Sequence, residues 1–493
     1  MMVKKNEANS FLNIFKSTAL FAFVQVFRSI VGIVKNKIIA VLLGAEGVGI
    51  IGVYDSIILF IQTFAGLGLR QSAVKDIAEV NEKSSAFSRT ISIVNKVVLF
   101  TAVLGGVITV VFSSFIGNWI LGDGDHFYLF LLLAIVVFLN IINEGNLTIL
   151  KGMRRLRLLA YANIIGVLVA FITAVPFYYF FKEKGIIPVF LVSAGVGMLI
   201  SNWFVKKISY ERIKLTIKEV YIEATPMMRM GIVLMFVTFL DTIVSLIIIS
   251  YVRHKGGFVE VGLFNAGKVI ISSYFGVLIT ALTTDYYPRI SEINNNNAQL
   301  EIELNKQSLM SIVLLAPLFV FFLFLLPFFI EILYTKEFLP AVDYIKFGIY
   351  GTLITICSNQ VDLILVAKQK VKVFTTISIV YRILQLLLSI YFYDLFGITG
   401  LGITIILTGI FHILAMSITV KVLYNIRFSN IFLKIALIVL IFALSSSYIS
   451  SLDDNVLKYV LGFVIFIFSC LFSILLFKNI FNIDLFNFIK KKF

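Results

Sequence analysis

The sequence predicts an all-α polytopic membrane protein of about 14 transmembrane helices. Of its 493 residues, 60% are hydrophobic and only 14% are charged, whereas soluble globular domains carry about 25% charged residues. Apolar runs of about 20 residues, each long enough to cross a hydrocarbon core about 30 Å thick, follow one another from Phe11 to Lys478. The composition therefore excludes a soluble globular protein.

Hydrophobic stretches separated by turn and charge signals give the order of the helices. The first six are predicted near residues 11–43, 48–68, 91–118, 127–150, 158–181 and 186–205. The next six are predicted near 227–251, 262–285, 308–333, 344–366, 373–394 and 399–421, and a last pair near 431–450 and 456–477. The longest connections are 206–226 and the Asn-rich 286–307, and both are too short to fold into a catalytic domain. We therefore expect that this protein is not an enzyme.

Alternate connections differ in charge, and this difference predicts the orientation of the chain. One set is basic, with Arg70, Lys75, Lys151, Arg154, Lys206, Lys207, Lys368 and Lys421 among its residues, whereas the other is short and often acidic. Both termini are therefore predicted to face the cytoplasm, in a multi-pass protein of the inner (plasma) membrane. The net charge of +15 reports this topology and not a nucleic-acid partner.

Two basic segments need a separate interpretation. The N-terminal apolar run continues past Gln25 and Arg28 without a small-residue cleavage signature, so it is predicted to be an uncleaved first helix. The stretch from Lys206 to Lys218 is predicted to be either an interfacial helix lying on anionic membrane lipid or a plain connector.

An internal repeat is visible when the sequence is laid over itself in the register that places Val48-Gly49-Ile50 on Val261-Gly262-Leu263. Two pairs of intramembrane charges also coincide in this register: Arg28 with Asp241, and Asp55 with Lys268. Two six-helix bundles related by a pseudo-twofold axis explain this, and transporters commonly carry the substrate path between such halves. The predicted domains are an N-lobe at 1–205, a basic linker at 206–226, a C-lobe at 227–425, and helices 13 and 14 with a basic tail at 426–493.

Ionisable side chains at membrane depth predict a hydrated cavity, because a charge facing hydrocarbon is costly. Gln25, Arg28 and Lys35 fall on one face of the first helix at 100° per residue. The predicted cavity residues are Arg28, Lys35, Lys268, Gln25, Asn265 and Arg382, and the predicted gating or ion-coupling residues are Asp55 and Asp241. Snorkelling towards the cytoplasmic ends is predicted for Lys96, Glu144, Arg229 and Asp362.

Two interpretations of these charges remain open. They can be ion pairs that hold the two lobes together, such as Arg28 with Asp241 and Asp55 with Lys268. Alternatively the cations bind an anionic head group, because arginine offers a planar fork to phosphate oxygens and lysine a point charge. Both interpretations can hold in different states of one transport cycle.

Signals for metal, nucleotide and disulfide chemistry are missing from the sequence. The three histidines are scattered and His412 is expected to be packed or hydrogen-bonded. No Gly-rich phosphate loop ends in Lys-Ser or Lys-Thr, and Cys357 and Cys470 lie inside predicted membrane helices. We expect no cofactor apart from a coupling proton or sodium ion.

Several motifs occur in an order and spacing that resemble one family. They are Leu42-Leu43-Gly44-Ala45-Glu46-Gly47-Val48-Gly49, Ala65-Gly66-Leu67-Gly68-Leu69, Gln71-Ser72-Ala73-Val74, Tyr287-Pro288-Arg289-Ile290-Ser291 and Phe396-Gly397-Ile398-Thr399-Gly400-Leu401-Gly402. The part of the chain before the last helix pair thereby resembles the O-antigen flippases and related polysaccharide-biosynthesis membrane proteins. These share a superfamily with the multidrug and toxin extrusion pumps and with the peptidoglycan lipid flippases.

The resemblance implies two six-helix bundles arranged as a V, and movement of undecaprenyl-pyrophosphate-linked oligosaccharide from the cytoplasmic to the periplasmic leaflet. It also implies cavity cations at Arg28, Lys35 and Lys268, and a polysaccharide polymerase and chain-length regulator as partners. Helices 13 and 14 depart from the 12-helix pattern of many O-antigen flippases, whereas the peptidoglycan lipid flippases have 14.

Alternative functions come from the same superfamily and from another class. A multidrug exporter favours acidic and aromatic cavity residues, and the excess of cations argues against it. A peptidoglycan-precursor lipid exporter fits the helix count. A non-transporting membrane scaffold of a polysaccharide assembly complex predicts instead that the loops matter and the cavity charges do not.

Overall fold

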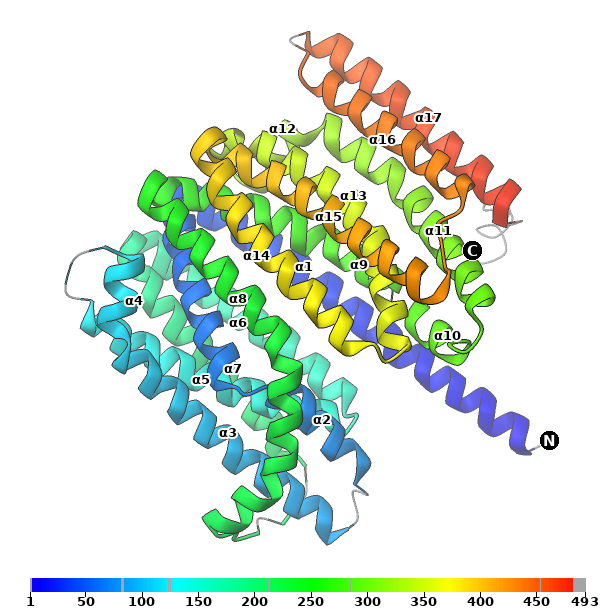
Figure 1. The fold of residues 1–493 in the computed structure, drawn as a ribbon. Helices are drawn as coiled ribbons and strands as arrows, with labels where there is room; N and C mark the ends of the chain where they lie inside the picture. Colours follow the sequence, from blue (N-terminus) through cyan, green and yellow to red (C-terminus); the bar gives the residue numbers. More distant parts are fainter. Residues whose placement is uncertain are drawn as a thin grey trace. The chain divides into compact units, whose positions relative to one another are not determined.

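A computed structural model describes residues 2–80, 84–122, 124, 126–208, 210–211, 213–283, 285–452 and 454–481, and these residues form helices and connections without a strand (Figure 1). The chain divides into two compact units, Met1–Gly262 (unit 1) and Leu263–Phe493 (unit 2). The boundary falls inside helix α8, so the two units are joined by a helix and not by a loop.

The helices of unit 1 follow one another through short connections. They are α1 (Met2–Ala65), α2 (Leu69–Glu79), α3 (Ser85–Val111), α4 (Ser113–Ile120), α5 (Phe127–Gly152), α6 (Leu156–Phe181), the 3₁₀ turn η1 (Lys182–Gly185), α7 (Ile186–Lys206) and α8 (Ile217–Lys268). Helices α3 and α7 both pack against α5, and α6 packs against α1 and α7. Helix α5 is therefore the centre of unit 1.

Unit 2 continues from the end of α8. Its elements are the π-helix η2 (Val269–Tyr274), α9 (Phe275–Thr283), α10 (Tyr286–Glu292), α11 (Asn297–Phe324), α12 (Leu326–Leu333), the 3₁₀ turn η3 (Lys336–Ala341), α13 (Val342–Ala367), α14 (Val371–Phe396), α15 (Ile398–Tyr424), α16 (Asn430–Ser450) and α17 (Asn455–Phe481). The Asn-rich stretch predicted as a connection contains α10 and the first turns of α11. Asn296 explains the early start of α11, because its side chain accepts a hydrogen bond from the Gln299 N–H at 3.1 Å and caps the helix.

Eleven segments in the described part of the chain are long and apolar enough to cross a membrane. Three of them, Phe23–Ala65, Leu156–Lys206 and Met235–Ser273, contain 43, 51 and 39 residues, about twice the 20 that one crossing needs. The chain is therefore a multi-pass membrane protein. A count of 14 crossings stays a prediction.

The internal repeat appears in the backbone at two glycines that coincide in the register of the repeat. Gly44 interrupts α1 with φ 67° and ψ −168°, and Gly257 interrupts α8 with φ 74° and ψ −173°. Positive φ values of this kind are accessible to glycine and strained for other residues. The same register places the short helix α4 on α12 from its first residue to its last, so the repeat predicted from sequence is confirmed.

The repeat-related glycines Gly49 and Gly262 lie at a close helix crossing within unit 1. A Cβ atom on Gly49 would lie 1.9 Å from the Phe258 carbonyl oxygen, and one on Gly262 would lie 1.9 Å from the Ala45 carbonyl oxygen. Small residues allow backbones in a membrane to approach this closely. The second half of α1 thereby packs closely on residues 258–262 of α8.

The segment between α7 and α8, residues 207–216, is called the connector below. Its described residues carry no helix. Instead, the Glu211 N–H donates to Ser88 Oγ at 3.2 Å, and the Ile213 N–H donates to Ser92 Oγ at 3.3 Å. Serines of α3 thus satisfy backbone groups that a helix would otherwise pair internally. The described residues of this segment form a non-helical connection, whereas the second half of the stretch predicted as a linker, from Ile217 onward, belongs to α8.

The C-terminal helices α16 and α17 lie side by side and pack on α11 of unit 2 (Figure 1). Ser446 Oγ donates to the Val320 carbonyl at 2.7 Å, and Ser473 Oγ donates to the Val313 carbonyl at 2.8 Å. Hydrogen bonds of this kind attach helices to one another where lipid provides no hydrophobic driving force. The appended pair is therefore an integral part of unit 2.

Candidate functional site

Unit 1 contains a polar cavity of about 750 Å³, called the cation cavity below. Residues of α1, α2, α5, α6 and α7 line it. Its polar and charged lining residues are Arg28, Arg70, Gln71, Asn143, Glu144, Thr148, Lys151, Asn163 and Ser193. Three cations and one carboxylate give these residues a formal charge of +2, which favours an anionic occupant.

Arg28 reaches the cation cavity from α1. Its Nη1 donates to Asn163 Oδ1 of α6 at 3.4 Å, and the Asn163 side chain is held in turn because its Nδ2 donates to the Leu159 carbonyl at 2.8 Å. Among the described residues Arg28 has no carboxylate partner, and its side chain is exposed. Most of its five N–H donors therefore stay available to a ligand.

Arg70 and Lys151 share this cavity, although the sequence placed both in basic connections. Arg70 lies in the first turn of α2, just after Gly68, whose φ of 66° reverses the chain. Its Nη1 lies 3.6 Å from Glu144 Oε2, and the two side chains are 64% and 46% exposed. Such an exposed pair is weak, so Arg70 can exchange Glu144 for another anion.

Small residues keep part of the cavity wall open. A Cβ atom on Gly166 of α6 would meet nothing within 4 Å, whereas one on Gly197 of α7 would lie 3.3 Å from Asn143 Nδ2. Both glycines line the cation cavity. Gly195 of α7 also faces open space but is not among the lining residues.

A smaller cavity of about 140 Å³ adjoins the first, because Arg70, Gln71, Glu144 and Thr148 line both. It extends towards Gln62, whose buried Nε2 has no hydrogen-bond partner. An unsatisfied buried amide is costly. The smaller cavity therefore extends from the cation cavity towards residues of α1 and α8.

Lys35 and Asp55, two further predicted site residues, lie on opposite sides of the Gly44 break in α1. They are close enough for electrostatic attraction, and Tyr178 of α6 is also near Asp55. Neither Lys35 nor Asp55 is among the residues that line the cation cavity. The cation that acts on Asp55 within unit 1 is Lys35, which the sequence did not pair with it.

The remaining predicted residues are divided between the units. Gln25 and Asp241 are exposed residues of unit 1 outside the cavity lining, on α1 and α8. Asn265 and Lys268 are half-buried in unit 2, just before the π-helix η2, and the Asn265 Nδ2 has no hydrogen-bond partner. Arg382 of α14 donates to Gln385 Oε1 of the same helix at 2.7 Å.

Unit 2 contains a buried pair of titratable groups that the sequence did not bring together. His412 Nε2 of α15 lies 3.8 Å from Asp362 Oδ1 of α13, and the two side chains are only 11% and 15% exposed. Ser358 Oγ hydrogen-bonds to His412 Nδ1, and the Tyr381 ring lies 4.9 Å from the imidazole. His412 is thus hydrogen-bonded as expected, whereas Asp362 lies inside unit 2 and does not snorkel.

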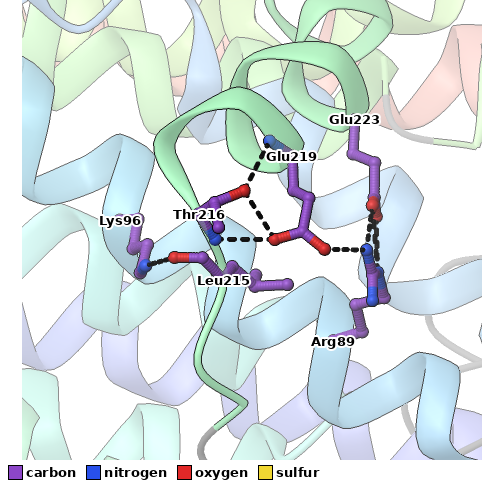
Figure 2. Close-up of polar contacts among 6 residues, drawn as sticks. All are labelled: Arg89, Lys96, Leu215, Thr216, Glu219 and Glu223. Atoms are coloured by element: carbon purple, nitrogen blue, oxygen red, sulfur yellow. Dashed lines mark hydrogen bonds and ion pairs between the residues drawn. The ribbon is translucent and has the colours of Figure 1, made fainter.

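At the start of α8, two glutamates hold the connector end on α3 (Figure 2). Arg89 Nε and Nη2 donate to the two carboxylate oxygens of Glu223 at 2.9 and 2.5 Å, and Arg89 Nη2 lies 3.5 Å from Glu219 Oε1. Thr216 and Glu219 form a capping box, because the Thr216 N–H donates to Glu219 Oε2 at 2.6 Å and the Glu219 N–H to Thr216 Oγ1 at 3.3 Å.

These hydrogen bonds change the acidity of both carboxyl groups. The bonds from Thr216, followed by the attraction of Arg89, hold the pKa of Glu219 below its ordinary value. The side-chain hydrogen bond from Arg89 lowers the pKa of Glu223. Lys96, for which snorkelling was predicted, also belongs to this region, because its ammonium donates to the Leu215 carbonyl of the connector (Figure 2).

Comparison with protein families gives one match, to the family described as polysaccharide biosynthesis protein, over residues 14–294. No curated protein matches the sequence. Similar solved structures are nevertheless found, and those named below share 16% identity or less with this chain. They therefore support the fold alone.

The lipid II flippase MurJ, in an inward closed conformation, superposes with a TM-score of 0.73 at 16% identity, over 93% of this chain and 99% of that one. An inward-facing multidrug resistance MATE transporter of the MOP superfamily gives a TM-score of 0.64 at 15% identity, over 82% and 99%. The MATE transporter VcmN of Vibrio cholerae gives 0.55 at 14% identity, over 85% and 97%. The chain therefore has the fold of MurJ and the MATE transporters, as the sequence predicted.

Proposed function

This chain belongs to the polysaccharide biosynthesis protein family, and from that premise we propose that it is a flippase for undecaprenyl-pyrophosphate-linked oligosaccharide, such as an O-antigen repeat unit. The observation that carries the proposal is the cation cavity, in which Arg28, Arg70 and Lys151 face about 750 Å³ of polar space. An arginine fork and lysine point charges suit pyrophosphate oxygens. The carboxamides of Asn143 and Asn163 suit sugar hydroxyls.

The physical need for such a cavity follows from the cargo. A pyrophosphate and several sugars would lose their hydrogen bonds to water on entering hydrocarbon, and each lost bond costs several kcal/mol. In the proposed mechanism the head group enters the cation cavity from the cytoplasm while the polyprenyl tail stays in lipid. Alternating access then releases the head group at the periplasmic leaflet.

Coupling to a proton or a sodium ion completes the mechanism. Asp55 and Asp241 keep the gating or ion-coupling role proposed for them, and Lys35, Lys268, Gln25, Asn265 and Arg382 keep their proposed contacts to the cargo. The Asp362–His412 pair adds a buried carboxylate that can share a proton with an imidazole. No resident cofactor enters the mechanism.

The cellular setting is part of the same proposal. The distribution of Lys and Arg supports an inner-membrane protein with both termini in the cytoplasm. A polysaccharide polymerase and a chain-length regulator are the proposed partners, because a flipped repeat unit must then be polymerised.

A second candidate cargo is the peptidoglycan precursor lipid. The helix pair α16–α17 and the coverage of 99% of the MurJ chain favour it, and its pyrophosphate suits the same cations. A multidrug exporter is a weaker candidate, because the net positive lining of the cation cavity repels cationic drugs.

Translocation in proteoliposomes tests the proposal. The purified protein is reconstituted with one of three fluorescent cargoes: a polyprenyl-pyrophosphate oligosaccharide, lipid II, or a cationic dye. We expect transfer of the oligosaccharide lipid between leaflets and no transport of the dye. Transfer of lipid II alone would favour the second candidate, dye transport alone would favour the multidrug exporter, and no transfer of any cargo would favour a scaffold.

A further inference from the structure

A second polar cavity of unit 1, about 470 Å³ in volume, shares no lining residue with the cation cavity. Residues of α3, α5 and α7 and of the connector line it. Its polar and charged lining residues are Ser92, Asn95, Lys96, Asn146, Asn202, Lys206 and Tyr210. The connector runs along this cavity on its way from α7 to α8.

The lining is rich in hydrogen-bond donors and carries two cations. The Lys96 ammonium donates to the Leu215 carbonyl, which does not neutralise its charge. Lys206 is exposed at the end of α7, and among the described residues it has no carboxylate partner. No acidic residue is among the residues described as lining the cavity, so its formal charge is +2 from two lysines.

Neutral donors point to the same kind of ligand. Tyr210 accepts a hydrogen bond from Asn95 Nδ2 at 3.1 Å through its phenol oxygen, so its own O–H remains available to donate. The Asn202 amide of α7 adds a further donor. Two ammonium groups, a phenol and an amide together fit the oxygens of a phosphate group.

The aromatic and basic residues next to the cavity indicate the source of that phosphate. Lys207 lies over the ring of Trp203 at 3.5 Å, next to Lys206, and the Trp203 side chain is 55% exposed. Exposed tryptophans and lysines at helix ends are typical of the membrane–water interface. Basic pockets between transmembrane helices at this level bind the head groups of anionic lipids.

We propose that this cavity is a binding site for the phosphate head group of an anionic membrane lipid. Lys96 and Lys206 contact the phosphate, and Tyr210 and Asn202 donate to it. Because Tyr210 and Ile213 of the connector form one wall, a bound lipid links the connector to α3 and α7. This site is separate from the cation cavity and does not depend on which cargo is transported.

Lipid binding to the purified full-length protein in neutral detergent tests the proposal, with native mass spectrometry and thermal unfolding as readouts. Phosphatidylglycerol is expected to bind and to raise the unfolding temperature, whereas phosphatidylcholine is not. Lys206→Gln is expected to weaken phosphatidylglycerol binding about fivefold, the factor expected for one basic contact to an anionic lipid. Lys214→Gln, an exposed connector lysine outside the lining, is the matched control and should bind as the intact protein does.

A second variant, Lys96→Gln, removes the other cation of the cavity. It also loses the ammonium that donates a hydrogen bond to the Leu215 carbonyl of the connector. Its binding is therefore compared with Lys206→Gln at equal folded fractions. Equal binding of the two lipids, or equal weakening by Lys206→Gln and Lys214→Gln, would overturn the proposal. Glycerol phosphate that binds as tightly as the lipid would assign the cavity to a free phosphate compound and would also overturn it.

Discussion

Units 1 and 2 repeat one backbone but place their charges differently. Helices α5 and α13 occupy equivalent positions, because each follows one of the repeat-related short helices α4 and α12. Glu144 of α5 is 46% exposed and lines the cation cavity, whereas Asp362 of α13 is 15% exposed beside His412. Equivalent helices thus expose the Glu144 carboxylate to a hydrated cavity in unit 1 and bury the Asp362 carboxylate in unit 2. The positions of the charges, and not the repeated backbone, therefore determine what each unit can bind.

The largest expected effect comes from filling the hydrated space of unit 1. Gly166→Leu should abolish translocation and leave the unfolding temperature nearly unchanged, because a Cβ atom there meets nothing within 4 Å and the side chain occupies the cation cavity. Translocation in proteoliposomes and thermal unfolding measure the two quantities. Gly195→Leu adds the same side chain outside the cavity lining and should translocate normally, so equal loss in both variants would contradict the assignment of the cavity.

A smaller effect is expected from the enclosed carboxylate of unit 2. Asp362→Asn cannot release or bind a proton, so translocation driven by a pH gradient should fall to the rate without a gradient. The charged and titratable groups around this site are His412, Tyr381 and Arg382, and none of them is altered. The comparison variant Glu144→Gln should keep its response to the pH gradient. If Asp362→Asn also kept the full response, the Asp362–His412 pair would not couple translocation to the gradient.

The smallest effect concerns the contact of Arg89 with Glu219 and Glu223. Because both carboxyl groups have a pKa below the ordinary value of 4.5, their contribution to stability is present above that pH and is lost as the pH falls through the lowered values. The Glu223→Gln protein should therefore unfold at a slightly lower temperature than the intact protein at pH 7, and the difference should shrink as the pH falls below the ordinary value of 4.5. A difference that grows on acidification would contradict this linkage.

The sequence predicted the helical fold and the repeat, and it drew attention to Arg28, because hydropathy and a single charge in an apolar run are local signals. It missed Arg70 and Lys151, since positive charges near helix ends are typical of loops. The contact between Asp362 and His412 joins two different helices and depends on how they pack, which no local pattern reports.

The most direct test of the cation cavity compares translocation of a polyprenyl-pyrophosphate oligosaccharide by the intact protein, Arg28→Ala and Arg70→Ala, with Lys75→Ala as control. Lys75 lies on α2 as Arg70 does, but pairs with Glu79 at 3.8 Å outside the cavity. Each arginine variant should translocate about 10 to 100 times more slowly, the loss expected for charge-assisted hydrogen bonds to phosphate, and Lys75→Ala should be unchanged. Folded arginine variants that translocate at the rate of the intact protein would contradict the central claim that these cations bind the pyrophosphate.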